Sequence, residues 1–445
     1  MQRPPFIPRW KALSLALALA GGALPSLQAQ SLLDLYSAAR GFDASYQSAK
    51  SQFDATLAKS AQARAAILPT ANFALGASRS NQEILPQPER SYGSQTATIS
   101  ASQPLYRPAN WASYEQGNKQ IALAQAQLQA AEQDLIVRVS QAYFDVLAST
   151  DSLAFVKSQK TAVAEQLASA KRNFEVGTST ITDSREAQAR FDLVVAQELA
   201  AENDLRVKTI ALNQLVGKSD AAPKPLAAPV VLAPLEPADA EAWVQQSATR
   251  HPGIQQQEIA LEVAKLETAK AEAGHKPTLD LTGSYSAVNN NNGTSTATAD
   301  SRVNVATIGV SFNLPLFAGF ATQNRIKETL ALEDKARTDL EATKRTVAQG
   351  TRTAFFGVLS GQGQVKALEA AEASSQSALD ANKLGYQVGV RINIDVLNSQ
   401  SQLFDTKAKL AKARYDVLLG GLKLKQANGS LVADDLNPIN SQLAN

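Results

Sequence analysis

Four segments of the chain alternate between apolar and polar residues, two in each half. Their apolar positions are Ala71, Phe73, Leu75 and Ala77, then Ala97, Ile99 and Ala101, then Leu279, Leu281 and Tyr285, then Ile308, Val310, Phe312 and Leu314. A period of two predicts β-strands with one apolar and one polar face. The polar positions are mostly Ser, Thr, Asn and Gly, and an Asn/Gly-rich tip at 289–293 separates the last two segments. Strands of about ten residues with such tips match the spanning segments and outer loops of a membrane β-barrel.

The rest of the chain has helical periodicity. From Asn110 to Phe174 there is no proline and almost no glycine. One helix of about 65 residues is therefore predicted, on the order of 100 Å long at about 1.5 Å per residue. Apolar residues recur in it at spacings of three and four, as in a coiled-coil seam. They are Ile121, Ala124, Leu128, Ala131, Leu135, Val139, Ala142 and Val146. A further helix is predicted over 32–66, before the first strand.

The two halves of the chain repeat one another. The matching pairs are Pro69-Thr70 with Pro277-Thr278, Pro104-Leu105-Tyr106 with Pro315-Leu316-Phe317, Ala142-Tyr143-Phe144 with Ala354-Phe355-Phe356, and Phe174, Val176, Gly177 and Asp183 with Tyr386, Val388, Gly389 and Asp395. Their offset drifts only from 208 to 212, which a few loop insertions would explain. Each copy predicts a helix, a β-hairpin, a very long helix and a final helix, so the chain is a tandem duplication.

The predicted domains follow from this duplication. The first copy covers 30–217 and the second covers 238–429. Between them, 218–237 carries five prolines and is expected to be an extended surface linker. The tail, 430–445, is polar, and we expect it to be loose.

Residues 1–29 have the layout of a secretory signal peptide. Basic residues precede a short apolar run from Ala12 to Leu24, and Ala29 precedes the expected cleavage site. Removal of this segment takes three basic residues and no acids from totals of 43 Lys+Arg and 41 Asp+Glu, leaving 40 against 41. That balance gives no reason to expect nucleic acid as a partner. The chain has no cysteine, so the exported fold must be held by packing rather than by disulfides.

Strand counting predicts an oligomer. Two strands per copy give four per chain, whereas membrane barrels begin at about eight strands. Because an eight-stranded barrel is filled by its own side chains, conduction favours three chains and twelve strands over two chains and eight. Aromatic residues near the strand ends suit a membrane-interface belt. They are Tyr92, Tyr106, Trp111, Phe317 and Phe320.

The duplicated unit, the proline-rich linker and the segment Leu-Gly-Tyr-Gln-Val-Gly-Val-Arg-Ile-Asn-Ile-Asp-Val-Leu-Asn at 384–398 resemble the TolC family of outer-membrane factors. The resemblance covers essentially the whole mature chain. It implies a mainly α fold with a membrane β-barrel, in which a homotrimer forms a 12-stranded barrel continued by an α-helical tunnel. It also implies an outer-membrane duct of a Gram-negative bacterium, used in tripartite efflux or type I secretion. Its partners would be a periplasmic adaptor, an inner-membrane transporter and outer-membrane lipid.

The resemblance also assigns a gate at the periplasmic entrance of the tunnel. The residues carried over are Thr182, Asp183, Tyr386, Arg391, Asp395 and Asn398. The family often has an acid at the position of Asn398, so the acidic ring is expected to be weaker here. Gly177 and Gly389 mark the hairpin tips, which in the family meet the adaptor. An alternative role for Asp183 and Asp395 is to cap the helices that follow those glycines.

Other functional classes find little support in the sequence. Gly217-Lys218-Ser219 lacks the first glycine and the helix of a phosphate-binding loop. The only histidines are His251 and His275, so no catalytic constellation, metal site or cofactor is expected and the protein is not expected to be an enzyme. The main alternative is an exported coiled-coil structural or adhesive protein without a pore, which should be extracted by salt or urea rather than by detergent. A periplasmic adaptor ranks behind it, because adaptors lack two barrel hairpins.

Overall fold

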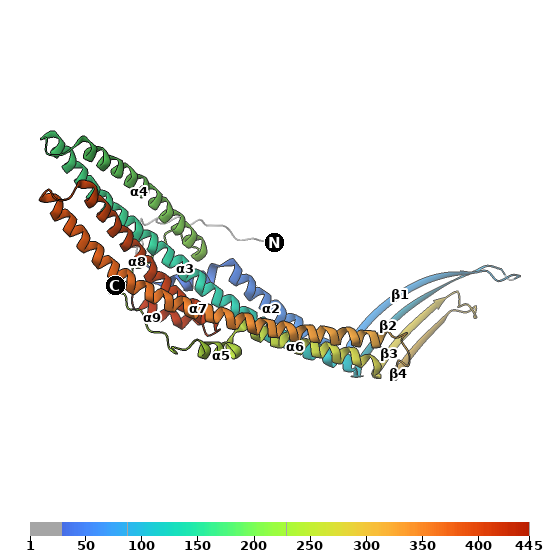
Figure 1. Cartoon of the computed structure of the whole chain (residues 1–445). Helices are drawn as coiled ribbons and strands as arrows, with labels where there is room; N and C mark the ends of the chain where they lie inside the picture. The colour runs from blue at the N-terminus through green and yellow to red at the C-terminus, as the bar shows by residue number, and fades with distance from the viewer. Residues whose placement is uncertain (1–28, 87, 228, 445) are drawn as a thin grey trace, which may run out of the picture.

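The computed structural model describes residues 29–86, 88–227 and 229–444. The predicted signal peptide, 1–29, lies outside this part of the chain apart from Ala29. The molecule is a long, bent rod with a β-sheet at one end and two helical hairpins at the other (Figure 1). The long helices therefore separate the sheet from the hairpin tips by most of the length of the rod.

Both halves contain two short helices, a β-hairpin, a very long helix and a final long helix. The first half consists of α1 (Leu32–Phe42), α2 (Ala44–Ala65), β1 (Thr70–Gln82), β2 (Arg90–Tyr106), α3 (Pro108–Glu175) and α4 (Ile181–Val216). The second consists of α5 (Ala240–Arg250), α6 (Pro252–Glu272), β3 (Thr278–Asn291), β4 (Ser301–Asn313), α7 (Ala321–Gln387) and α8 (Asn393–Ala427), followed by the short α9 (Asn437–Asn440). The predicted strands and the long uninterrupted helix are confirmed.

The helix predicted over 32–66 is wrong in one respect, because it is broken into α1 and α2 at Asp43. The carboxylate of Asp43 accepts the N–H of Tyr46 at 2.8 Å, which caps α2. The same carboxylate binds the guanidinium of Arg138 on α3 through two contacts of 2.9 and 3.0 Å. This break therefore anchors the short helices to the long one. In the second half, His251 breaks α5 from α6 and accepts the N–H of Gly253 through Nδ1.

The four strands form one antiparallel sheet in the order β1-β2-β3-β4. The register places Phe73, Ile99 and Tyr285 in one row across three strands. The neighbouring row holds Asn72 and Ser100 on the opposite face. Because side chains alternate between faces, the sheet has one mainly apolar and one mainly polar face. Within the chain, the outer edges of β1 and β4 have no strand partner among the described residues.

The long helices α3 and α7 contain 68 and 67 residues and form the body of the rod. The largest core lies midway along it, where α1, α3, α4 and α8 meet around Tyr143 and Phe144. None of the described helices has the length and apolar character needed to cross a bilayer.

The tail after Gly429 is not loose, and that prediction is wrong. Four of its apolar side chains are buried in the central core, namely Leu431, Leu436, Ile439 and Leu443. Its backbone also pairs with the linker through Leu226 and Leu443. The tail is polar on average, but most of its few apolar residues lie on the side that packs against the helices, Val432 being the exposed exception.

Candidate gate at the helical hairpin tips

Each long hairpin turns at a glycine with a left-handed backbone. Gly177 has φ 80° between α3 and α4, and Gly389 has φ 78° between α7 and α8. A Cβ at either position would touch nothing within 4 Å, so glycine is required by the backbone angle rather than by lack of space. Both turns lie at the end of the rod opposite the sheet (Figure 1).

Asp183 is held by the start of α4. The helix N-cap is Thr180, and Asp183 is the third helical residue. Its carboxylate accepts the hydroxyl of Ser179 at 2.6 Å and the hydroxyl and N–H of Thr180 at 2.9 and 3.1 Å. The hydrogen bond from Ser179 is the main reason that the pKa of Asp183 is lowered. Asp183 therefore stays charged, and it completes a capping box rather than forming the cap itself.

Arg391 and Asp395 pair within the second hairpin. Arg391 Nη1 lies 3.7 Å from Asp395 Oδ2, one helical turn apart. The cap of α8 is Ile392, which offers no side-chain hydrogen bond, so Asp395 is not a cap. Arg391 folds back against Gly385, where a Cβ would lie 2.7 Å from Arg391 Cγ. A larger residue at position 385 would therefore displace Arg391 from its packing against α7.

Several side-chain contacts join the first hairpin to the second, and those nearest the tips involve Tyr386, Asn398 and Asn393. Tyr386 Oη accepts Asn173 Nδ2 at 3.2 Å, and Asn398 Oδ1 accepts Arg190 Nη2 at 2.7 Å. Asn393, which is almost fully buried, accepts a hydrogen bond from Gln166 on α3. Its own Nδ2 also approaches the carbonyl of Asp183 at 3.5 Å.

Apolar contacts support these polar ones. Leu397 of α8 is buried against Val163 and Leu167 of α3. Tyr386 packs on Leu379 and Val396 within the second hairpin. The hairpins are thus held together by an apolar seam with a few polar contacts near the tips, an arrangement that can have two discrete packings.

The structure brings some of the predicted gate residues together and leaves others apart. Tyr386 and Asn398 bond across the hairpins, and Asp183 contributes its carbonyl. Arg391 and Asp395 pair only with each other, and Thr182 is exposed with no side-chain hydrogen bond among the described residues. The sequence interpretation missed four bonding partners, namely Gln166, Asn173, Arg190 and Asn393. Polar residues on helix faces that otherwise pack are a possible signal for such positions.

Comparisons with known proteins agree with this architecture. The sequence profile of the family described as outer membrane efflux protein matches residues 35–218 and 243–430. The chain belongs to this family. It is 34% identical over 434 residues to the outer membrane protein TolC of Vibrio cholerae, covering 97% of this chain and 98% of that one. It is 29% identical to the alkaline protease secretion protein AprF of Pseudomonas aeruginosa, covering 91% and 85% of the two chains.

The fold of this outer membrane efflux protein family member is shared by solved structures. The outer membrane protein VceC of Vibrio cholerae superposes with a TM-score of 0.77 at 19% identity, covering 90% of this chain and 96% of that one. The outer membrane channel CmeC of Campylobacter jejuni superposes with a TM-score of 0.78 at 16% identity, covering 92% of this chain and 89% of that one. The family match and the full-length relatives make the chain an outer-membrane channel protein of the TolC family. The solved structures confirm the predicted mainly α fold with its duplicated helix and β-hairpin unit.

Proposed function

We propose that three copies of this chain form a passive duct across the outer membrane and the periplasm. The observation that carries the proposal is the four-stranded sheet, which has two unpaired edges and one apolar face. Four strands cannot close alone, and in lipid every backbone group needs a partner. Pairing β4 of one chain with β1 of the next gives twelve strands in three chains, wide enough for a wet lumen lined by the polar face. The long helices then continue the barrel as a tunnel.

The entrance of the proposed duct lies at the hairpin tips. We assign the gate to Thr182, Asp183, Tyr386, Arg391, Asp395 and Asn398, together with the bonding partners found above. Opening would separate the second hairpin from the first and break the contacts between them. Because Asn398 is neutral and is bound by a guanidinium, we expect weaker block by multivalent cations than a second acidic ring would give.

The tips also suit a protein partner. Val176, Val388 and Val390 are 73%, 65% and 79% exposed beside Gly177 and Gly389. Apolar residues clustered at one exposed end favour docking of another protein. We assign this surface to a periplasmic adaptor, which in turn engages an inner-membrane transporter. Efflux and type I secretion are both consistent with the names of the relatives.

Cross-linking and conductance test this proposal. Protein extracted in detergent should cross-link into trimers and give small, steady openings in a planar bilayer. Asp395→Ala should reduce cation selectivity, and Arg391→Ser should enlarge the openings because it removes the pair that braces the tip. If the protein is released by urea without detergent and no current appears, the duct is refuted and the coiled-coil structural protein becomes the better account.

A further inference from the structure

The apolar face of the sheet ends in a polar, basic row close to the outer loops. The register aligns Ala77, Gln95, Asn289 and Arg302 across all four strands on one face. One row nearer the helices on that face come Leu75, Ala97 and Ala287 with the polar Asn304 on β4, and beyond them Phe73, Ile99, Tyr285 and Ala306. One row nearer the loops lies Arg79, opposite Gly93. The face therefore changes from apolar to cationic over a few residues.

The position of this change matches the outer boundary of a membrane. From Leu279 to Ala287 the apolar face extends about 27 Å along β3 at about 3.4 Å per residue. A strand tilt of about 40° reduces that to roughly 21 Å along the membrane normal, near the roughly 25 Å band of outer-membrane barrels. Because the helices leave from the opposite ends of the strands, the row with Arg302 lies at the outer leaflet.

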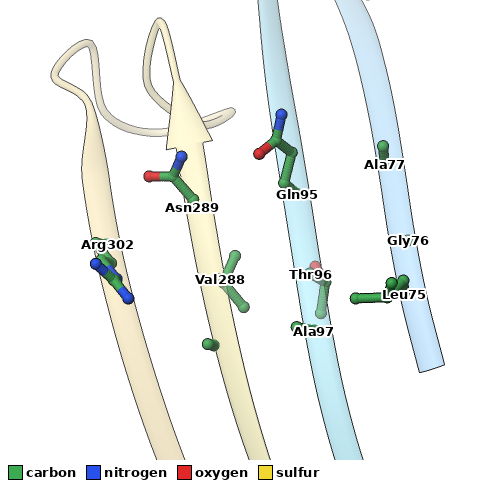
Figure 2. Close-up of a pocket in the computed structure, with 10 residues that line it drawn as sticks. Leu75, Gly76, Ala77, Gln95, Thr96, Ala97, Val288, Asn289 and Arg302 are labelled. Carbon is green, nitrogen blue, oxygen red and sulfur yellow. The ribbon is translucent and has the colours of Figure 1, made fainter. Parts of the chain in front are cut away.

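Small side chains leave a hollow at this boundary. A depression of about 620 Å³ is lined by seven residues of this face, which are Leu75, Ala77, Gln95, Ala97, Ala287, Asn289 and Arg302. Figure 2 shows Gln95 and Asn289 on neighbouring strands on the side toward the loops, Arg302 on β4 somewhat further from the loop, and Leu75 and Ala97 further down their strands. The hollow thus has a polar upper rim and an apolar floor.

The two arginines here have no acidic partner among the described residues. Arg302 is exposed without a side-chain hydrogen bond, and Arg79 only donates from Nε to Ser91 Oγ at 2.8 Å. Arg90 differs, because its Nη2 donates to three carbonyls of the β3–β4 loop. The nearby carboxylate of Asp300 does not pair with either arginine, because it accepts the backbone N–H of Asn292. Two guanidinium groups at the rim of an apolar surface are therefore available for an anion.

We propose that this row binds the phosphate of an anionic, phosphorylated lipid in the outer leaflet. The acyl chains lie along the apolar band below Leu75 and Ala97. One phosphate is bound by Arg302 with Asn289 and Gln95 as further donors, and Arg79, three strands away on β1, binds a second phosphate of the same headgroup. Charge complementarity favours a phosphorylated headgroup over a neutral one, and the adjoining apolar band favours a lipid over a free anion. The inference rests on the location of the sheet in the outer membrane and does not require conduction.

Lipid binding to the detergent-purified channel, followed by native mass spectrometry, tests this inference. The probes are diphosphoryl lipid A, its dephosphorylated counterpart and inorganic phosphate. Each of Arg79→Gln and Arg302→Gln should weaken binding of the phosphorylated lipid about fivefold, and the double variant about 25-fold. Arg302→Lys should retain most of the affinity. Arg345→Gln is the matched control, since Arg345 is exposed on α7 far from the sheet, and it should change nothing.

Several results would overturn the site. These are equal binding by the wild type and the double variant, equal binding of the dephosphorylated lipid, or displacement of the lipid by millimolar inorganic phosphate. Conductance of the same preparations should be unchanged, because both arginines are on the face opposite the polar one. A lost or altered conductance in Arg302→Gln would place this residue in the lumen and also refute the assignment. A preparation without any channel activity, by contrast, would count against the duct and leave the lipid measurement valid.

Discussion

Removal of the Asn393 carboxamide should favour the open entrance. This side chain is 1% exposed and bonds to Gln166 of α3 and to the carbonyl of Asp183. Asn393→Ala removes both contacts, each contributing about 1 kcal/mol, and leaves the amide of Gln166 without its partner. If opening breaks these contacts, the closed state loses about 2 kcal/mol per chain, a roughly 30-fold shift. Three chains opening together would give about 6 kcal/mol, enough to reverse a closed preference of a few kcal/mol.

The assay is single-channel recording with a matched control. Asn382→Ala removes a similar amide, which bonds to Ser399 within the second hairpin rather than across the hairpins. We expect a raised open probability and larger mean conductance for Asn393→Ala, and wild-type currents for Asn382→Ala. Thermal denaturation of both variants shows whether they lose similar stability. If the two variants are equally destabilised and conduct alike, the contact does not hold the entrance closed.

Three further predictions concern stability. Burial lowers the pKa of His251, so the unfolded chain takes up the proton first and stability falls as the pH drops below about 6.5; His251→Asn should show a smaller fall in melting temperature between pH 7.5 and 5. Thr180→Ala removes the cap of α4 and should cost about 1 kcal/mol in urea denaturation, against almost nothing for the exposed Thr182→Ala. Leu436→Ala should cost about 2–5 kcal/mol, whereas Val432→Ala, at a position 52% exposed, should cost far less; equal effects would mean that the tail is not part of the core.

The sequence was most informative where structure depends on local periodicity. Alternation in β1 and β4 predicts strands and their apolar face, because neighbouring side chains in a strand must point to opposite sides. The absence of proline from Asn110 to Phe174 predicts α3 for a similarly local reason. The break at Asp43 was missed because both flanking segments are good helix formers, and the break is stabilised by Arg138, distant in sequence.

The contacts of the candidate gate residues could be predicted only in part. Resemblance supplied Tyr386 and Asn398, but their partners Asn173 and Arg190 are more than two hundred residues away in sequence. Which polar residues meet depends on how α3, α4 and α8 pack, and helical periodicity does not specify that packing. The prediction of a loose tail was wrong for the same reason. The four apolar side chains of the tail are buried only by packing against the helices, which the sequence of the tail does not show.

The unpaired edges of β1 and β4 have a consequence for the life of the chain before assembly. Before assembly, a subunit has two unpaired strand edges and an exposed apolar sheet face. Such edges can pair with any extended peptide. In the proposed trimer, the sheet is protected by pairing with the neighbouring subunits and by contact with lipid. One subunit with a mutation that prevents edge pairing would therefore prevent barrel closure in every trimer that contains it. When defective and intact chains are made in equal amounts, only about one ring in eight of the proposed trimer would be wholly intact, so edge mutations should be dominant.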